Sequence, residues 1–223
     1  MERFLDSKKL LIKIKEIFEL YVKHGSRSSK KVDCLHTYFK SEIDEIIKKD
    51  KIYECHLEFN VPSFNMSGRK KCDIVVLKNK IPHIIFPVKF IMSNYKQNRN
   101  NSWENLTGEM MQIKWKNPTV YILPINIIFD EVPYLKKNGK IKHFEKINYQ
   151  KSFEIYEKLR ELGIAYDMIN YIIEVKIEDP IEGEYRSCPE LIKFSHCTPF
   201  KSMKNLLAPI IGDDSDQSEK VEN

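Results

Sequence analysis

The chain has 223 residues, of which 42% are apolar, so it is long enough for one sizeable core and too short for two comfortable domains. Its longest apolar run is interrupted by prolines, a histidine and a lysine and falls short of the ~20 residues that span a bilayer. The first nine residues are too charged for a signal peptide, and the five cysteines contain no C-x-x-C pair, which argues against a disulfide framework or a zinc site. We expect a soluble, cytoplasmic domain over residues 1–211 and an acidic, disordered tail over 212–223.

The charge of this domain is strongly positive. The net charge is +5, and the tail carries five acids and one lysine, so the body carries 5 − (−4) = +9. A field of this sign favours polyanions, of which nucleic acid is the commonest. A lysine-rich composition that merely reflects a biased genome is the alternative explanation. The positive residues cluster at 27–31, 48–51, 69–71, 96–99 and 136–142.

Two helices are predicted first, over about 6–24 and 33–49, with Gly25 ending the first one. Glu42 falls at the edge of the apolar arc of the second helix. It is either a half-exposed residue whose stem covers the helix edge, or an acid that points towards Asp73. The apolar arc consists of Leu35, Phe39, Ile43 and Ile46.

The next predicted elements are strands. A strand over 54–61 is followed by a turn region over 62–71, and then by two apolar runs, one beginning at Asp73 and the other extending from residue 81 to 92. Asp73 in the first run and Lys89 in the second are charged side chains that a buried strand does not normally tolerate, so we expect them to meet at the strand ends. Three basic residues at the end of the turn region are candidates for gripping a phosphate backbone: Arg69, Lys70 and Lys71.

A polar stretch over 93–101 precedes a helix predicted over 101–114, with Asn101 and Glu104 as its capping box. Glu109 lies on the flank of the buried face of this helix and is better aimed at the sheet than Glu104. The polar stretch is either an ordinary surface loop or a loop that contacts DNA. Its candidate contacts are Asn94, Lys96 and Arg99.

The remaining elements are an apolar strand over 119–128, a basic hairpin turn over 136–140 and a helix over 149–162 that ends at Gly163. Periodicity leaves residues 166–177 open between helix and strand. Residues 180–199 read as irregular, and 200–207 as a short last helix.

The order of these elements, with Glu42, Asp73, Lys89 and Glu109 in successive positions, resembles the common core of the PD-(D/E)XK nuclease superfamily over about residues 33–123. The resemblance implies an α/β, restriction-endonuclease-like core, in which a central mixed β-sheet is flanked by helices. It also implies a Mg²⁺-dependent DNA endonuclease. Asp73 and Glu109 would bind the metal, Lys89 would position the attacking water, and Glu42 would assist.

The chain departs from the superfamily pattern at Pro87, which stands where an acid two residues before Lys89 is usual. Glu109, or failing that Glu104, would have to supply the second carboxylate; otherwise the protein would resemble an inactive relative that binds DNA without cutting it. A literal E-x-K also occurs at residues 174–176, but its possible partners are poorly spaced: Asp167 is too close, and Asp130 requires a long excursion.

Other mechanisms find less support in the sequence. The six histidines show no paired spacing, which argues against a histidine-metal nuclease, and the seven glycines form no phosphate-cradling loop, so no nucleotide cofactor is expected. By resemblance, a compact chain without helicase or ATPase motifs is most similar to a type II restriction endonuclease that acts on double-stranded DNA as a homodimer. A structure-specific repair or recombination nuclease, a non-catalytic DNA-binding relative and an interaction domain without nucleic acid are the alternatives.

Overall fold

The computed structural model describes residues 2–25, 28–177, 188–196, 198 and 202–212. Among these residues, no helix combines the length and the apolar character needed to cross a bilayer. The elements in chain order are α1 (Glu2–His24), α2 (Lys30–Ile47), β1 (Tyr53–Pro62), β2 (Arg69–Lys78), β3 (Ile81–Phe86), β4 (Val88–Phe90), α3 (Tyr95–Lys116), β5 (Tyr121–Ile122), β6 (Ile125–Phe129), β7 (Glu131–Leu135), β8 (Ile141–Lys146), α4 (Tyr149–Glu161), β9 (Ile169–Ile177), β10 (Pro189–Phe194) and α5 (Met203–Gly212).

Where the prediction had one central mixed sheet, the described strands form two four-stranded mixed sheets, β1-β2-β3-β5 and β10-β9-β6-β4, which continue into each other as one central layer. β1, β2 and β3 are an antiparallel meander, and the chain then crosses through α3 so that β5 pairs in parallel with β3. Further along, β4, β6 and β9 are parallel neighbours, and β10 closes the row antiparallel to β9. The hairpin of β7 and β8 stands apart from this sheet.

Two prolines interrupt the middle of the sheet without separating its halves. β3 leads into β4 through Pro87, and β5 leads into β6 through Pro124. The register is the same on both sides of the break, because each residue pairs with the one 37 positions later (121 − 84 and 127 − 90). The N–H of Ile125 donates to the carbonyl of Pro87 at 2.8 Å. The two strand segments therefore act as one long pair.

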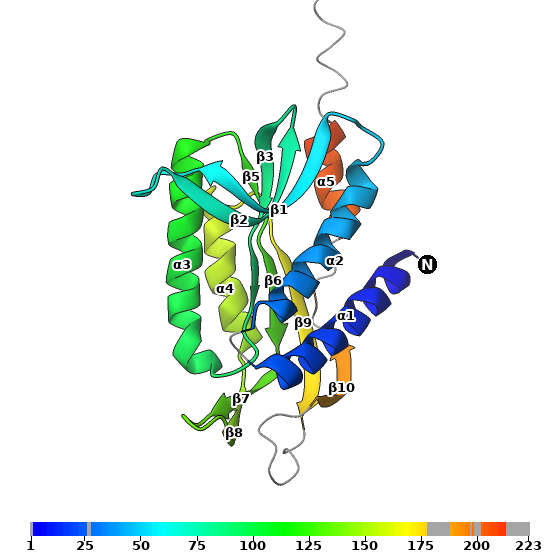
Figure 1. Cartoon of the computed structure of the whole chain (residues 1–223), viewed down its shortest axis with the longest axis vertical. Coiled ribbons are helices and arrows are strands. Elements are labelled where there is room, and N and C mark those ends of the chain that lie inside the picture. Colours follow the sequence, from blue (N-terminus) through cyan, green and yellow to red (C-terminus); the bar gives the residue numbers. More distant parts are fainter. Residues whose placement is uncertain (1, 26–27, 178–187, 197, 199–201, 213–223) are drawn as a thin grey trace, which may run out of the picture.

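Helices cover both faces of the sheet (Figure 1). α1, α2 and α5 pack on one face, in a cluster that contains Phe18, Phe39 and Phe86. α3 and α4 pack on the other face, where Leu106 and Met110 are buried. Full burial of a side chain of this size stabilises the fold by roughly 1.5–3 kcal/mol, so both layers hold the sheet firmly. The molecule is thus an α/β structure in which helices flank a mixed sheet.

The start of α3 differs from the prediction. The helix begins at Tyr95, so Asn101 and Glu104 lie within it, and the predicted capping box is wrong. The reason lies far away in the sequence. Asn94 adopts a left-handed conformation (φ 53°), its N–H donates to the carbonyl of Pro133, and its Oδ1 accepts from the N–H of Leu135.

Several strands also begin or end at residues other than those predicted. The turn before β2 is confined to residues 63–68 and ends at Gly68 (φ +69°), so Arg69, Lys70 and Lys71 lie on the strand rather than in the turn. The apolar run over 81–92 is divided at Pro87, and the one over 119–128 is divided near Pro124.

Of the elements predicted after residue 135, some are confirmed and others differ from the prediction. The hairpin turn at 136–140 is confirmed, and residues 169–177 are a strand. The segment predicted to be irregular contains β10, because its residues pair with β9. The last helix begins at Met203, later than predicted, and the predicted acidic tail lies outside the described residues beyond Gly212.

Candidate metal site

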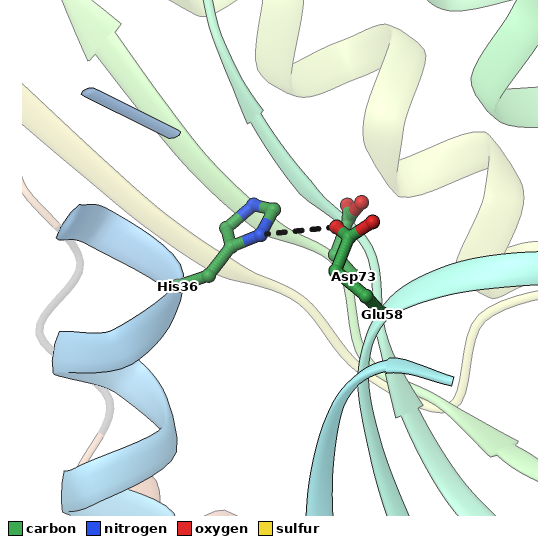
Figure 2. Close-up of side chains that lie close together, drawn as sticks. All are labelled: His36, Glu58 and Asp73. Atoms are coloured by element: carbon green, nitrogen blue, oxygen red, sulfur yellow. Dashed lines mark ion pairs between the residues drawn. The ribbon is translucent and has the colours of Figure 1, made fainter. Parts of the chain in front are cut away.

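Three side chains with metal-binding atoms meet beside the central sheet. His36 comes from the buried face of α2, Glu58 from β1 and Asp73 from β2, and one ligand atom of each lies within 4.8 Å of the other two (Figure 2). Within the described part of the chain, this is the one group of three or more histidine, cysteine or acidic side chains that could hold a metal ion. The helix and the hairpin therefore bring together groups that are far apart in the sequence.

Glu58 and Asp73 oppose each other across the β1–β2 hairpin. Leu57 pairs with Ile74 and Phe59 pairs with Cys72, so the two acids occupy the facing positions between these pairs. Like charges in such positions repel each other, and a cation between them would remove the repulsion. The pairing thus concentrates negative charge at one point.

The backbone at Glu58 is unusual for a strand. Its φ is +53°, a region that non-glycine residues seldom adopt and that costs of order 1–3 kcal/mol. Leu57 packs with the cluster beneath α1 and α2, whereas Phe59 packs with the cluster beneath α3 and α4. Residues two apart on a regular strand share one face, so the left-handed residue turns the strand over. The strain therefore lies at the centre of the site.

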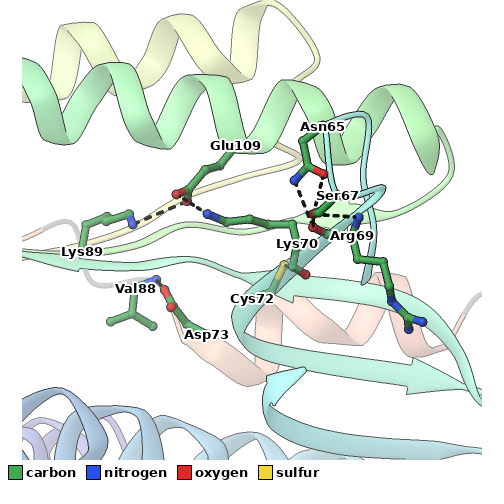
Figure 3. Close-up of polar contacts among 9 residues, drawn as sticks. All are labelled: Asn65, Ser67, Arg69, Lys70, Cys72, Asp73, Val88, Lys89 and Glu109. Atoms are coloured by element: carbon green, nitrogen blue, oxygen red, sulfur yellow. Dashed lines mark hydrogen bonds and ion pairs between the residues drawn. The ribbon is translucent and has the colours of Figure 1, made fainter. Parts of the chain in front are cut away.

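Asp73 also closes the break in the sheet. Its Oδ2 accepts a hydrogen bond from the N–H of Val88 at 2.8 Å (Figure 3). Val88 follows Pro87, the residue between β3 and β4. The backbone pairing of β2 with β3 ends at Phe86, so the side chain of Asp73 supplies the hydrogen-bond acceptor that the β2 backbone would otherwise offer to Val88. This contact fixes Asp73 in position beside β4.

Two cationic or titratable groups accompany Glu58. Lys71 Nζ lies 2.5 Å from Oε2 of Glu58, and His36 Nδ1 lies 3.8 Å from Oε1. Burial lowers the pKa of His36, and the charges of Asp73 and Glu58 oppose that shift only in part. Neutral imidazole is the form that ligates metals, so His36 is suited to that task at neutral pH.

Glu109 is engaged by lysines. Its carboxylate lies 2.6 Å from Nζ of Lys70 and 3.8 Å from Nζ of Lys89. In Figure 3 both lysines reach the carboxylate of Glu109 on α3, whereas the carboxylate of Asp73 meets the N–H of Val88. Glu109 is therefore the counter-ion of two lysines here, and its role as a metal ligand stays a prediction that would require Lys70 to leave.

Glu42 lies on the same helix as His36 but is not part of the three-residue group. The two positions are six residues apart, which is about 9 Å along the helix axis. The turn of α2 that meets Asp73 is the one that carries His36. Glu42 thus lies outside the three-residue group, and its assisting role stays a prediction.

The predicted DNA contacts divide into engaged and exposed side chains. Lys70 and Lys71 form ion pairs with acids, and Asn94 is bound to β7. Arg69 on β2 is exposed, as are two residues in the first turns of α3, where the sequence predicted a loop. These two residues are Lys96 and Arg99.

The competing E-x-K motif lies on β9, where its members have structural partners. Glu174 pairs with Lys193 at 2.9 Å, and Lys176 pairs with Glu190 at 2.8 Å, both across to β10. Asp130, the possible partner acid, accepts a hydrogen bond from the N–H of Val175 at 2.8 Å. These contacts account for the charges on β9 as links between strands.

Sequence reasoning missed His36 and Glu58. His36 lies three residues before Phe39 and seven before Ile43, which is the spacing of a shared helix face, so its place on the buried side of α2 was available as a signal. Glu58 could be placed opposite Asp73 only once the hairpin register was known. No protein-family model, curated protein or solved structure matches this chain.

Proposed function

We propose that this chain is a divalent-metal-dependent endonuclease that hydrolyses phosphodiester bonds in DNA. The observation that carries the proposal is the group of His36, Glu58 and Asp73, with Lys89 one residue beyond the backbone group that Asp73 binds. Two carboxylates suit Mg²⁺ or Mn²⁺, and the imidazole favours Mn²⁺ of the two. Such an ion, when bound, neutralises charge on the phosphate and lowers the pKa of a water.

The three residues would hold the ion from three different elements. Asp73 keeps one oxygen on the N–H of Val88 while its carboxylate faces the group, so its orientation is fixed before any ligand arrives. Glu58 is fixed by the strand pairing on either side of it. His36 is buried, and burial lowers its pKa, which favours the neutral imidazole that donates a lone pair to a metal. The site is therefore preorganised.

Lys89 would hold the attacking water or a phosphate oxygen through its ammonium group. Glu109 keeps the side chain of Lys89 on the α3 side of the strand, at 3.8 Å, and Lys70 shares that carboxylate. Glu109 is thus a positioning residue in this proposal. Its effect would be exerted through Lys89.

DNA is the substrate that the charge of the chain favours. The body of the protein carries +9, and Arg69, Lys96 and Arg99 are exposed cations on β2 and α3. The succession of α2, an antiparallel meander, α3 and a parallel strand supports a restriction-endonuclease-like core. In this proposal His36 and Glu58 replace the acid that is missing at Pro87, and a homodimer would place one site on each DNA strand.

The decisive experiment is cleavage of supercoiled plasmid by the purified chain with Mg²⁺ or Mn²⁺, and with EDTA as the metal-free control. We expect His36→Gln, Asp73→Asn and Lys89→Ala each to lower the cleavage rate at least about 100-fold, since each removes a ligand or a cation at the reacting phosphate. Lys176→Ala is the matched control, because Lys176 is an exposed strand lysine with an acidic partner.

Full cleavage by Asp73→Asn would overturn the proposed site. Loss of cleavage in Lys176→Ala, with Lys89→Ala unchanged, would move the site to β9. Salt-sensitive DNA binding without cleavage in either metal would identify a non-catalytic DNA-binding protein instead. Preference for branched over plain duplex would identify a structure-specific nuclease.

A further inference from the structure

Three large apolar side chains lie exposed together at the end of the β1–β2 hairpin. Phe64 and Met66, in the turn, are 68% and 106% exposed, and Trp115, near the end of α3, is 63% exposed. The rings of Phe64 and Trp115 touch edge to face, with centroids 6.2 Å apart. Exposed apolar side chains that gather in this way mark contact sites. We call these three residues the tip cluster.

The tip cluster is held in a defined position. The N–H of Phe64 donates to the carbonyl of Gln112 at 2.9 Å, and Asn117 Nδ2 donates to the carbonyl of Pro62 at 2.8 Å, so the turn is fastened to α3. Within the turn, Ser63 N–H donates to the carbonyl of Gly68. A surface that is already ordered binds with little entropic cost. In Figure 1 the turn projects past α3.

The surroundings of the tip cluster are positively charged. Neither the hairpin segment 59–72 nor the segment 110–129 contains an acidic residue. Exposed Arg69 and Lys116 form no ion pair with the described residues. A second copy of this surface, placed against the first by two-fold symmetry, would oppose cations to cations. The segments contain five cations: Arg69, Lys70, Lys71, Lys114 and Lys116. Lys70 pairs with Glu109 and Lys71 pairs with Glu58, two acids that lie just outside these segments, so Arg69 and Lys116 carry the charge that is open to a partner.

We propose that the tip cluster contacts the bases of DNA bound at the metal site, with Met66 and Phe64 wedged against or between base steps and Trp115 supporting them. Apolar side chains flanked by cations are the means by which proteins unstack and bend DNA, and aromatic rings also stack on exposed bases. Arg69 and Lys116 contact the neighbouring phosphates. This inference rests on the proposed function and adds the part of the protein that distorts the substrate.

The β1–β2 hairpin sets the distance between the DNA contact at its turn and the phosphate bound at Asp73. Arg69 and Asp73 are four residues apart on β2, which is about 13 Å along a strand. Stacked bases are 3.4 Å apart along one strand, so this span corresponds to about four base pairs. Arg69 would therefore meet the same DNA molecule about four base pairs from the phosphate at Asp73, with the tip cluster beyond Arg69.

The test uses the full chain without metal and DNA duplexes that carry 2-aminopurine at successive positions. Binding is followed by anisotropy, and unstacking by the rise in 2-aminopurine fluorescence. We expect Met66→Ala and Trp115→Ala to abolish that rise and to weaken binding about tenfold. Arg69→Ala should weaken binding to all sequences and lower the salt slope by about one. Ile81→Ala and Leu162→Ala are matched controls, because Ile81 is 67% and Leu162 is 71% exposed elsewhere on the molecule.

The outcomes separate this inference from the endonuclease proposal. If the wild type binds DNA and both tip variants bind and unstack it equally well, the tip inference is overturned and the endonuclease proposal stands. If tip variants change only the sedimentation of the DNA-free protein, the cluster faces a second copy and the inference is also overturned. Asp73→Asn should unstack DNA as the wild type does without cutting it. A wild type that unstacks DNA but cuts in no metal would support the tip inference and defeat the endonuclease proposal.

Discussion

The carboxylate of Asp73 accepts a hydrogen bond from the N–H of Val88, with 2.8 Å between Oδ2 and the nitrogen. One side chain thus joins β2 to the strand that resumes after Pro87 and also contributes to the group with His36 and Glu58. Pro87 stands at the break between β3 and β4, and Asp73 closes that break. Fold and site are therefore coupled at this residue.

Substitution of Asp73 can separate its two roles. Asp73→Asn keeps an oxygen for the N–H of Val88, so we expect the free energy of unfolding to change by less than about 1 kcal/mol. Asp73→Ala leaves that buried N–H without an acceptor and should cost about 1–3 kcal/mol. Both variants should lose the stabilisation that Mn²⁺ gives the wild type. Urea denaturation with and without Mn²⁺ measures both effects, and equal stabilisation of Asp73→Asn by Mn²⁺ would place the metal elsewhere.

Glu109 can be tested as a counter-ion or as a ligand. Because its carboxylate faces Lys70 and Lys89, we expect Glu109→Gln to leave Mn²⁺ affinity unchanged and to lower kcat about tenfold through misplacement of Lys89. The stability cost should not exceed about 1 kcal/mol, since these groups are about a third exposed. Calorimetric titration with Mn²⁺ and single-turnover cleavage check this, with Glu104→Gln as the control. Loss of metal binding would instead show that Glu109 is a ligand.

Glu58 offers a test of stored strain. Glycine adopts a φ of +53° freely, so Glu58→Gly should raise the free energy of unfolding of the metal-free protein by about 0.5–1 kcal/mol while removing metal binding. The substitution also removes the repulsion between the carboxylates of Glu58 and Asp73, which raises the free energy of unfolding as well. Glu54→Gly, elsewhere on the same strand, is the control and should be destabilising. A destabilised Glu58→Gly in metal-free urea titrations would contradict the prediction.

Asp130 should make stability depend on pH. Burial raises its pKa, Glu174 adds to the rise, and the hydrogen bond from Val175 N–H opposes it. The folded state therefore binds the proton more readily than the unfolded state, so the free energy of unfolding falls as pH rises from below 3.8 through the raised pKa. Asp130→Asn keeps the acceptor for Val175 and removes the charge.

The variant should match the wild type near pH 3 and be the more stable protein near pH 7, as urea titrations across that range would measure. A wild type that gains stability over Asp130→Asn as pH rises would contradict the assigned cause. Lys176→Ala, which leaves Asp130 untouched, controls for general effects on β9.

Local chemistry determined many of the elements. Gly25 and Gly163 end helices with φ of +84° and +67°, as their sequence positions predicted, and the hairpin at 136–140 follows from its turn residues. Asp73 and Lys89 stood out because charges are rare in apolar strands. These signals act over a few residues, so the sequence alone carries them.

The tertiary structure decided the composition of the site. Glu58 faces Asp73 only because of the hairpin register, and His36 reaches them only because α2 packs across the sheet. The start of α3 depends on a hydrogen bond that Oδ1 of Asn94 accepts from the N–H of Leu135, 41 residues away. Such pairings depend on how distant segments pack, and the periodicity of a single segment does not encode them. The sequence by itself indicated several of the strands and the charges of Asp73 and Lys89, and the packing determined which side chains surround Asp73.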